Sequence, residues 1–251
     1  MSVHSQVSGT SPSEPSSPEF SPLDITQDLT PLPVYKEVIV SKPTFDGLLS
    51  QPVELREDLS SGCGGQTWQA GMVLGKHMLR YHATDLGQER ILELGAGGGL
   101  VGLAVARGCA IGAPLYITDQ LEMFSLMEHN IALNNLEDKV KARILNWGEP
   151  LDEEIRSFKP TAILAADCVY FEPAFPLLLR TLADLLELNS DATVYFCFKK
   201  RRRADQHFMA KAKKMFVITE AEDEDRSVFG RDKVFLYTIR SKKSAVAGIR
   251  G

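Results

Sequence analysis

A glycine-rich stretch between two short apolar runs constrains the fold of this 251-residue chain more than any other feature. Ile91–Leu94 is a short apolar run, four of residues 95–99 are glycine, helical apolar spacing begins at Leu100, and Leu115–Thr118 is a second apolar run. Glycine permits positive φ and lacks the Cβ atom that would keep a ligand away from the backbone. A helix that follows such a turn presents unpaired N–H groups to that ligand. The stretch therefore predicts strand, tight turn, helix and strand, as in half of a nucleotide site.

Two cofactors compete for this site on the sequence alone. Gly97, Gly99 and Gly102 match the dinucleotide pattern G-x-G-x-x-G, which favours NAD but is a weak signal when taken alone. Glu93, Gly95 and Gly97 instead match E-x-G-x-G, which puts a carboxylate where a dinucleotide would place its pyrophosphate. A carboxylate repels pyrophosphate but suits the α-amino group of S-adenosylmethionine, whose sulfur is also cationic. Glu93 therefore favours a methyltransferase.

Acidic and aromatic residues follow the ends of successive predicted strands. Asp119 closes the second strand of the stretch, where an acid can accept hydrogen bonds from both hydroxyls of a ribose. Trp147 follows the third predicted strand, and Asp167 follows Thr161–Ala166, an apolar run typical of a strand buried on both faces. In doubly wound sheets, ligands bind outside the carboxyl ends of the strands. We therefore expect these side chains and that of Glu93 on one rim of the sheet.

The alternation of strands and helices predicts an α/β fold with a doubly wound, mostly parallel sheet. The last two strands, joined by the acidic and turn-rich residues 220–232, are expected to pair as an antiparallel hairpin. Residues 1–33 are rich in Ser and Pro and are expected to form a disordered tail. Two short strands, within 34–40 and 53–59, are expected before the core. The domain is expected to span residues 34–241, followed by a flexible tail at 242–251.

The charge and cysteine content bear on several classes of function. With 28 Lys and Arg against 33 Asp and Glu, the formal net charge is −5, so no overall field would recruit nucleic acid or an anionic membrane. The four cysteines lie far apart without a C-x-x-C pair, which argues against zinc and against a disulfide framework, and no metal site is expected. Neither a membrane span nor a signal peptide is recognisable. We expect an intracellular protein, cytoplasmic or nuclear.

Several motifs together resemble the seven-β-strand class I methyltransferases, specifically the methyltransferase-like 21 group of protein-lysine methyltransferases. They are G-G-Q-T-W-x-A-G at 64–71, L-E-L-G-A-G-x-G-L-V-G-L at 92–103, N-W-G at 146–148 and A-D-C-V-Y at 166–170, together with Asp119. The resemblance implies strand order 3-2-1-4-5-7-6 with the last strand antiparallel, an N-terminal β-arm and S-adenosylmethionine as cofactor. Within the group, this chain is most similar to fungal enzymes that modify a lysine of translation elongation factor 1-alpha. That protein is therefore the implied partner of a monomeric enzyme.

The resemblance also implies roles for individual residues. Asp167 and Tyr170 would be the D-x-x-Y motif beside the transferred methyl group. The chain departs from the group at Gly98, where relatives often have Thr or Ser, and at Gln69, where they commonly have Pro. The residues implied in cofactor binding are Trp68 beside the cofactor, Glu93 near its amino group, Gly95, Ala96 and Gly97 beneath it, Asp119 on the ribose, Trp147 on the adenine and Ala166 in the pocket wall.

Other interpretations stay open at this point. Three other classes of protein would share the glycine-rich half-site. They are a class I methyltransferase acting on a small molecule or a nucleic acid, an NAD-dependent oxidoreductase and a non-catalytic cofactor-binding adaptor. The basic run Lys199–Arg203 could receive an acidic substrate surface, begin a solvated helix or act as a nuclear-localisation patch. His77 is expected to be packed or solvent-facing, without a chemical role.

Overall fold

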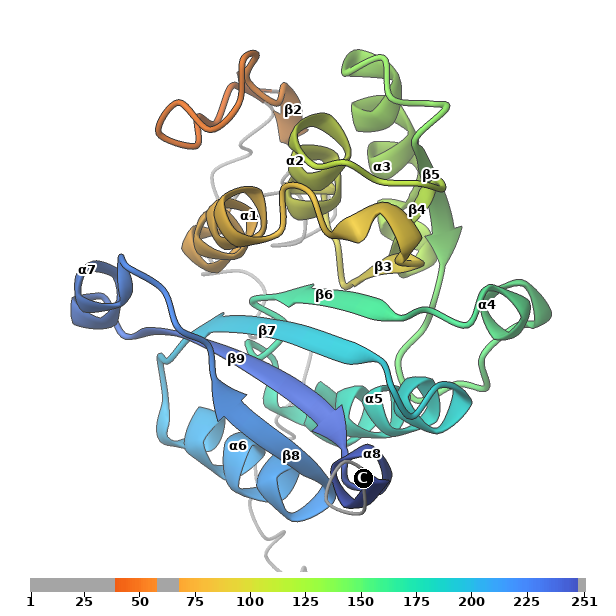
Figure 1. Ribbon diagram of the computed structural model, residues 1–251, viewed down its shortest axis with the longest axis vertical. Coiled ribbons are helices and arrows are strands. Elements are labelled where there is room, and N and C mark those ends of the chain that lie inside the picture. The colour runs from red at the N-terminus through yellow and green to blue at the C-terminus, as the bar shows by residue number, and fades with distance from the viewer. Residues whose placement is uncertain (1–38, 58–67, 248–251) are drawn as a thin grey trace, which may run out of the picture. The chain divides into compact units, whose positions relative to one another are not determined.

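The structure, a computed structural model, describes residues 39–57 and 68–247 (Figure 1). The tail predicted at 1–33 lies outside the described residues. So do residues 34–38 and 58–59 of the two predicted N-terminal strands, residues 62–67 of the glycine-rich loop and residues 248–251 of the predicted C-terminal tail.

The described residues contain one seven-stranded sheet, in the order β5-β4-β3-β6-β7-β9-β8. Counted along the chain, this is the order 3-2-1-4-5-7-6 that the resemblance implied. β9 pairs antiparallel with both of its neighbours, whereas the other pairs are parallel. The strands are β3 (Ile91–Leu94), β4 (Leu115–Asp119), β5 (Val140–Ile144), β6 (Ala162–Ala166), β7 (Thr193–Lys199), β8 (Phe216–Glu220) and β9 (Val234–Ser241).

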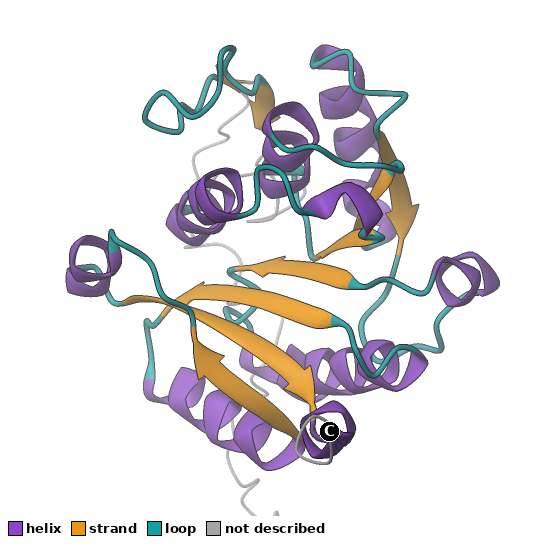
Figure 2. Ribbon diagram, viewed as in Figure 1, coloured by secondary structure: helices purple, strands orange, loops and turns teal. Residues whose placement is uncertain are grey.

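Helices lie on both faces of this sheet, as the colouring by secondary structure shows (Figure 2). One face packs against α1 (Gln69–Tyr81), α2 (Leu100–Gly108) and α3 (Leu121–Leu133), and the other against α4 (Glu153–Phe158), α5 (Phe175–Leu188) and α6 (Arg203–Met215). The five longer helices agree with the sequence, whose helical patterns at about 69–81, 121–134 and 174–188, from Leu100 and up to about 214 predict helices. The six-residue α4, whose first turn is capped by Asp152 through the amide of Ile155 at 2.8 Å, is too short to show a helical period and was not predicted.

Side chains of each strand alternate between the two faces because successive Cβ atoms point to opposite sides of a sheet. Ile91 packs on the face covered by α1, α2 and α3, whereas Leu92 and Leu94 pack on the opposite face. Glu93 therefore shares the face of Ile91 and lies beneath α2. The position of Glu93 in this alternation decides the face to which the one acidic side chain of β3 points.

The predicted N-terminal strands form a separate antiparallel pair, β1 (Ile39–Ser41) and β2 (Leu55–Glu57). Two buried asparagines of α3 hold this arm: Asn130 Oδ1 accepts from the amide of Arg56 at 2.8 Å, and Asn134 Oδ1 accepts from the amide of Glu54 at 2.9 Å. The asparagines stand four residues apart, on one side of the helix. The β-arm is thus confirmed within the described residues.

Two further short helices were not predicted. α7 (Arg226–Arg231) interrupts the connection between β8 and β9, which do pair as the expected antiparallel hairpin. α8 (Lys242–Ala247) continues directly from β9, where the sequence predicted a flexible tail. Within the part of the chain that the structure describes, no helix is long and apolar enough to cross a membrane.

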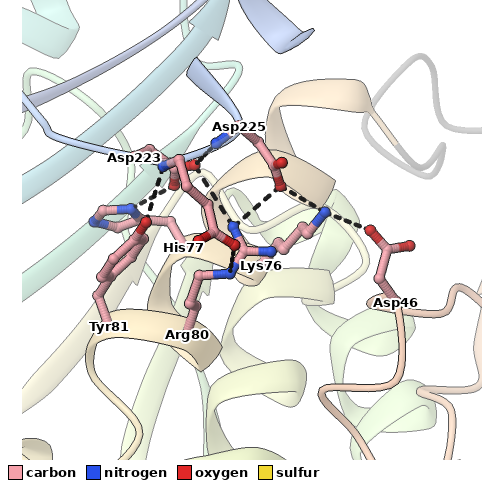
Figure 3. A network of polar contacts seen from close by, with 8 residues as sticks. Asp46, Lys76, His77, Arg80, Tyr81, Asp223 and Asp225 are labelled. Atoms are coloured by element: carbon pink, nitrogen blue, oxygen red, sulfur yellow. Dashed lines mark hydrogen bonds and ion pairs between the residues drawn. The ribbon is translucent and has the colours of Figure 1, made fainter. Parts of the chain in front are cut away.

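A polar network ties α1 to the segment between β8 and α7 (Figure 3). His77 Nδ1 lies 2.8 Å from Oδ2 of Asp223, and both side chains are almost completely buried. Lys76 pairs with Asp46 and with Asp225, whose carboxylate lies 2.7 Å from the lysine ammonium. His77 is thus packed, as expected, and serves to attach the last part of the chain to α1.

Candidate active site

The turn between β3 and α2 has the conformation that its glycines predict. Gly95, Gly97 and Gly99 have φ values of +66°, +55° and +87°, which L side chains rarely adopt. The turn is anchored on the sheet because the amide of Ala96 donates to the carbonyl of Thr118 at 2.9 Å. The turn is also held from outside, where Asn130 Nδ2 donates to the Gly98 carbonyl at 2.9 Å.

The Glu93 carboxylate lies beneath this turn and not on the open rim. Its side chain is buried, and its Oε2 atom accepts from the amide of Gly102 in the first turn of α2 at 2.7 Å. Burial raises the pKa of Glu93 to about 8, against the opposing effect of the amides of Gly102 and Val101. The sequence placed Glu93 at the rim, but β3 ends one residue later and its alternation turns this side chain inward. Contact between Glu93 and a ligand amino group stays a prediction.

Asp119 stands at the carboxyl end of β4, next to the glycine turn. Its Oδ2 accepts from the amide of Gly97 and its Oδ1 from the amide of Gln120, each at 2.8 Å. Burial raises the pKa of this carboxyl, while the two amides oppose that shift. Each carboxylate oxygen has two acceptor lone pairs, so both retain capacity for a further donor. This arrangement fits the predicted role in holding ribose hydroxyls.

Trp147 is placed by the turn that follows β5. Gly148 has φ +79° and donates from its amide to Oγ1 of Thr181 on α5 at 2.8 Å. The Trp147 ring lies over Gly95 so closely that a Cβ at residue 95 would be 2.8 Å from Cζ2 of the indole. The structure therefore brings the indole to the glycine turn, and its predicted contact with an adenine stays a prediction.

Asp167 follows β6 directly and has a left-handed conformation, with φ +56°. Its side chain is only 3 % exposed and is paired with Arg201, Nη1 lying 2.9 Å from Oδ1 and Nη2 lying 2.6 Å from Oδ2. The amide of Lys199 also donates to Oδ1 at 3.1 Å. The pair raises the pKa of Arg201, chiefly through its hydrogen bonds with Asp167. The sequence did not predict this partner.

Trp68 and Gln69, at the start of α1, meet the basic run from the other side. The Arg201 guanidinium carbon lies 5.0 Å from the centre of the Trp68 ring, within cation–π distance. Lys199 Nζ donates to Oε1 of Gln69 at 2.9 Å, and Gln69 Nε2 donates to Oδ2 of Asp232 at 2.5 Å. Gln69, where relatives commonly have Pro, thus bridges β7 and the start of β9. These contacts show that much of the basic run is bound within the chain.

Ala166 and Tyr170 lie on either side of Asp167. Ala166 is the last residue of β6 and is half-buried beside the core, as expected for a residue in a pocket wall. Tyr170 is 50 % exposed, and Phe171 next to it is exposed to a similar extent. The backbone carbonyl of Tyr170 accepts a hydrogen bond from Arg202. The rings of Tyr170 and Phe171 therefore face solvent beside the buried Asp167.

The residues at this rim fit the adenosyl part of S-adenosylmethionine. A nucleoside needs a close approach to backbone, an acceptor for its hydroxyls and a flat apolar wall. The glycine turn, Asp119 and Trp147 supply these three features at neighbouring strand ends. Among residues 39–57 and 68–247, no group of His, Cys, Asp and Glu side chains is arranged to hold a metal ion.

Sequence reasoning missed two residues of the site. Asn130 is buried in α3 and holds the Gly98 carbonyl, and its only signal was an amide side chain within an amphipathic helix. Arg201 belongs to the basic run that was interpreted as a surface feature, but its side chain pairs with Asp167.

A cavity of about 430 Å³ lies beside α1 and is lined by Gln69, Met72, Phe229 and others. No candidate site residue lines this cavity.

Comparisons with known proteins agree with this geometry. A family model described as lysine methyltransferase matches residues 48–215, which include both the glycine turn and the Asp167–Arg201 pair.

Curated relatives share a similar part of the chain. Protein-lysine N-methyltransferase EFM6 of Saccharomyces cerevisiae is 37 % identical over 201 residues, which cover 72 % of this chain and 82 % of that protein. Protein N-lysine methyltransferase METTL21A of Danio rerio is 31 % identical and covers 81 % of this chain and 92 % of its own length. METTL21A of Mus musculus is 30 % identical, with 70 % of this chain and 80 % of that protein covered.

Proposed function

Because the chain belongs to the lysine methyltransferase family, and is a protein-lysine N-methyltransferase that uses S-adenosylmethionine, we propose that its acceptor is translation elongation factor 1-alpha. The family membership rests on a match over 48–215, which is more than half of the chain. The finer proposal rests on two points. The motifs at 64–71, 92–103 and 166–170 resemble those of the fungal enzymes that modify this factor, and the chain is 37 % identical to a yeast protein-lysine N-methyltransferase. An acceptor in the translation machinery also places the enzyme in the cytoplasm.

The chain's own residues would hold the cofactor and direct the acceptor to it. The glycine turn, Asp119 and Trp147 would hold the adenosine part, and Trp68 would flank it. S-adenosylmethionine, when bound, supplies a methyl group that is attacked in line from the side opposite its sulfur. The protein must therefore align an uncharged lysine amine with that axis. We assign this alignment to the loop that carries Asp167 and Tyr170.

The state of Asp167 bears on how that amine is delivered. A lone carboxylate beside the acceptor would orient its ammonium but would also raise the pKa of the amine and so oppose proton loss. Here the guanidinium of Arg201 neutralises the Asp167 charge across two hydrogen bonds of 2.9 and 2.6 Å. The pair can therefore offer an acceptor lone pair to the amine with less penalty for its deprotonation. Tyr170, half exposed beside this pair, would desolvate the amine, which lowers its pKa, and water would take the proton.

This assignment rests on the position of Asp167 at the carboxyl end of β6. Arg201, which is bonded to Asp167, also lies over the ring of Trp68. The test begins with transfer of a labelled methyl group to purified translation elongation factor 1-alpha. A parallel reaction uses a lysate of cells that lack this protein, with mass spectrometry of the labelled band. Metabolite and RNA fractions of the same lysate serve as alternative acceptors. Label in the metabolite or RNA fractions, or only in a protein band other than translation elongation factor 1-alpha, would contradict the proposed acceptor.

A pair of matched variants tests the role of Asp167. Asp167→Ala is expected to lower turnover by about a hundredfold while the affinity for S-adenosylhomocysteine, measured by calorimetry, stays within about threefold of wild type. Asp138→Ala is the control, because Asp138 is exposed and precedes β5 at the opposite rim of the sheet. Unchanged turnover in Asp167→Ala with intact cofactor binding would show that the assigned role is wrong.

A further inference from the structure

Arg201 makes the most extensive set of contacts of the described basic run, and its side chain contacts two candidate site residues, Asp167 and Trp68. Both of its terminal nitrogens bond the Asp167 carboxylate, at 2.9 and 2.6 Å, in the two-pronged geometry that suits a guanidinium. Asp167 is almost completely buried, whereas the Arg201 side chain is 30 % exposed. The arginine thus closes over a buried acid from the solvent side.

The same guanidinium also covers the Trp68 ring, with 5.0 Å between its central carbon and the ring centre. Trp68 belongs to the start of α1, and Asp167 to the loop after β6. These two site residues are far apart in sequence, and Arg201 touches both of them. A planar, delocalised cation can bond a carboxylate at its edge and stack on an aromatic ring with its face.

The backbone of Arg201 is held independently of its side chain. Its amide donates to Oδ2 of Asp205 at 2.7 Å, and the amide of Arg202 donates to the same oxygen at 2.9 Å. Asp205 is fully buried in the first turn of α6. The loop between β7 and α6 is therefore fixed by backbone contacts, so a change in the Arg201 side chain can be made without removing them.

We propose that Arg201 is a positioning residue that holds the Asp167 carboxylate and the Trp68 ring in their working orientations and supplies the counter-charge of that buried acid. The inference rests on the proposed function, because it gives Arg201 a role in the reaction through Asp167. Arg201 itself acts through these two side chains and is not assigned a contact with the reacting atoms.

The electrostatic surroundings of Asp167 explain why this partner matters. Asp119 on β4, Asp167 itself and Glu93 on β3 all lie near Cys168, whose pKa is raised chiefly by burial and further by these three acids. The positive groups on the other side are Arg201 and, at the end of β7, Lys199, whose ammonium is bonded to Gln69. Without Arg201, Asp167 would be a buried carboxylate that lacks a charged partner, with the Asp119 carboxylate nearby, and its negative charge would be costly. Asp205, the remaining acid of the loop, would not compensate for this loss.

The test compares variants of the full chain. Arg201→Met removes the charge and the forked donors but keeps an unbranched apolar side chain over Trp68. Arg201→Lys keeps the charge and loses the fork. Asp167→Asn and the double variant D167N/R201M complete a double-mutant cycle. The control is Arg203→Met, an exposed arginine two positions away on α6.

Two measurements are made on each variant. The first is kcat and KM for the protein acceptor between pH 6 and 9. We expect R201M to lower kcat by about a hundredfold with KM within about threefold of wild type, and the ratio of R201M to wild-type kcat to fall as the pH falls. R201K is expected to keep the wild-type pH profile with an intermediate kcat. R201M is expected to change kcat by less than about threefold in the D167N background, because both changes remove the same interaction.

The second measurement is thermal unfolding between pH 5 and 8, which requires neither acceptor nor cofactor. In R201M the buried Asp167 carboxylate has lost its charged partner, so its ionised form costs stability, and the melting temperature of R201M is expected to fall increasingly below that of wild type towards pH 8. This extra pH dependence is expected to vanish in D167N/R201M and to be absent in R203M.

The outcomes separate this inference from the proposed function. If wild type and R203M methylate the acceptor but the effects of R201M and D167N multiply, the positioning role is wrong and the function stands. If neither wild type nor R203M transfers a methyl group while R201M shows the pH-dependent loss of stability, the proposed acceptor is wrong and the coupling of Arg201 to Asp167 stands. If the melting temperatures of R201M and wild type differ by the same amount at every pH, the coupling of Arg201 to Asp167 is wrong.

Discussion

The carboxylate of Glu93 holds the first turn of α2 from inside the molecule, its Oε2 atom lying 2.7 Å from the amide nitrogen of Gly102. Two opposing effects act on this group. Burial beneath the helix disfavours the charged form, whereas the unpaired amides of a helix N-terminus favour it. Burial dominates, because the pKa of Glu93 is raised to about 8. Glu93 is therefore largely protonated at neutral pH, and it acts first as a structural contact between β3 and α2.

Replacement of Glu93 by Gln is expected to change how stability depends on pH. The unfolded chain ionises this group near its ordinary pKa of 4.5, and the folded chain near 8, so the folded state binds an extra proton between these values. The contribution of protonated Glu93 to stability is complete below about pH 4.5 and is lost as the pH rises through 8, by up to about 5 kcal/mol. Urea unfolding at pH 5.5 and 8.5 should show a smaller difference for E93Q than for wild type. Equal pH dependence in both proteins would show that Glu93 does not titrate in this range.

Substitution at Gly95 is expected to disturb Trp147 as well as the backbone. An added Cβ would be 2.8 Å from the indole and 3.0 Å from Sγ of Cys168, in addition to the cost of an L residue at φ +66°. Gly47 provides a matched control, because its φ is +81° but a Cβ there meets nothing within 4 Å. In chemical unfolding, Gly47→Ala should lower the free energy of unfolding by about 1–2 kcal/mol. Gly95→Ala should lower it by about 1–3 kcal/mol more. Similar losses for both variants would contradict the close packing of Trp147 on Gly95.

Asp119→Asn is expected to weaken cofactor binding through the turn as well as through the lost charge. Both carboxylate oxygens accept a backbone amide, from Gly97 and Gln120, but an asparagine has only one such oxygen. The affinity for S-adenosylhomocysteine should fall by about 10- to 100-fold in calorimetry. Glu122→Gln, an exposed acid in the next helix, serves as the control and should bind as wild type does. Unchanged affinity in D119N would remove Asp119 from the cofactor site.

Acidification is expected to loosen the network that joins α1 to the segment before α7. Burial lowers the pKa of His77, an effect that outweighs the opposing effect of the hydrogen bond and charge of Asp223. The neutral imidazole therefore stabilises the folded chain above its ordinary pKa of 6.5, and this contribution is lost as the pH falls through the lowered value. Between pH 7.5 and 5, the melting temperature of His77→Gln should decline less than that of wild type. His129→Gln, at an exposed position, should follow wild type. If it does not, the effect does not belong to His77.

The glycine turn could be predicted because it depends on local chemistry, whereas the order of the strands was implied by the resemblance that the motifs carry. Glycines between an apolar run and a helical pattern indicate this turn wherever they occur, and the three positive φ values agree with it. Short elements such as α4 and α7 escaped prediction because six residues do not show a helical period. The strand ends at Asp119 and Asp167 could be placed on one rim because parallel strands share a direction.

Sequence alone determined the fold, the family and the rim at which Asp119, Trp147 and Asp167 gather, because each follows from a periodic pattern or a motif carried by neighbouring residues. Tertiary structure decided which side chains face which. The alternation of β3 turned Glu93 inward under α2. The parallel pairing of β6 with β7 brought Arg201, which follows β7, next to Asp167, which follows β6. Contacts between residues far apart in sequence depend on the register and direction of packed elements, which no local pattern specifies. That is why a run of basic residues interpreted as surface contains the partner of a buried acid.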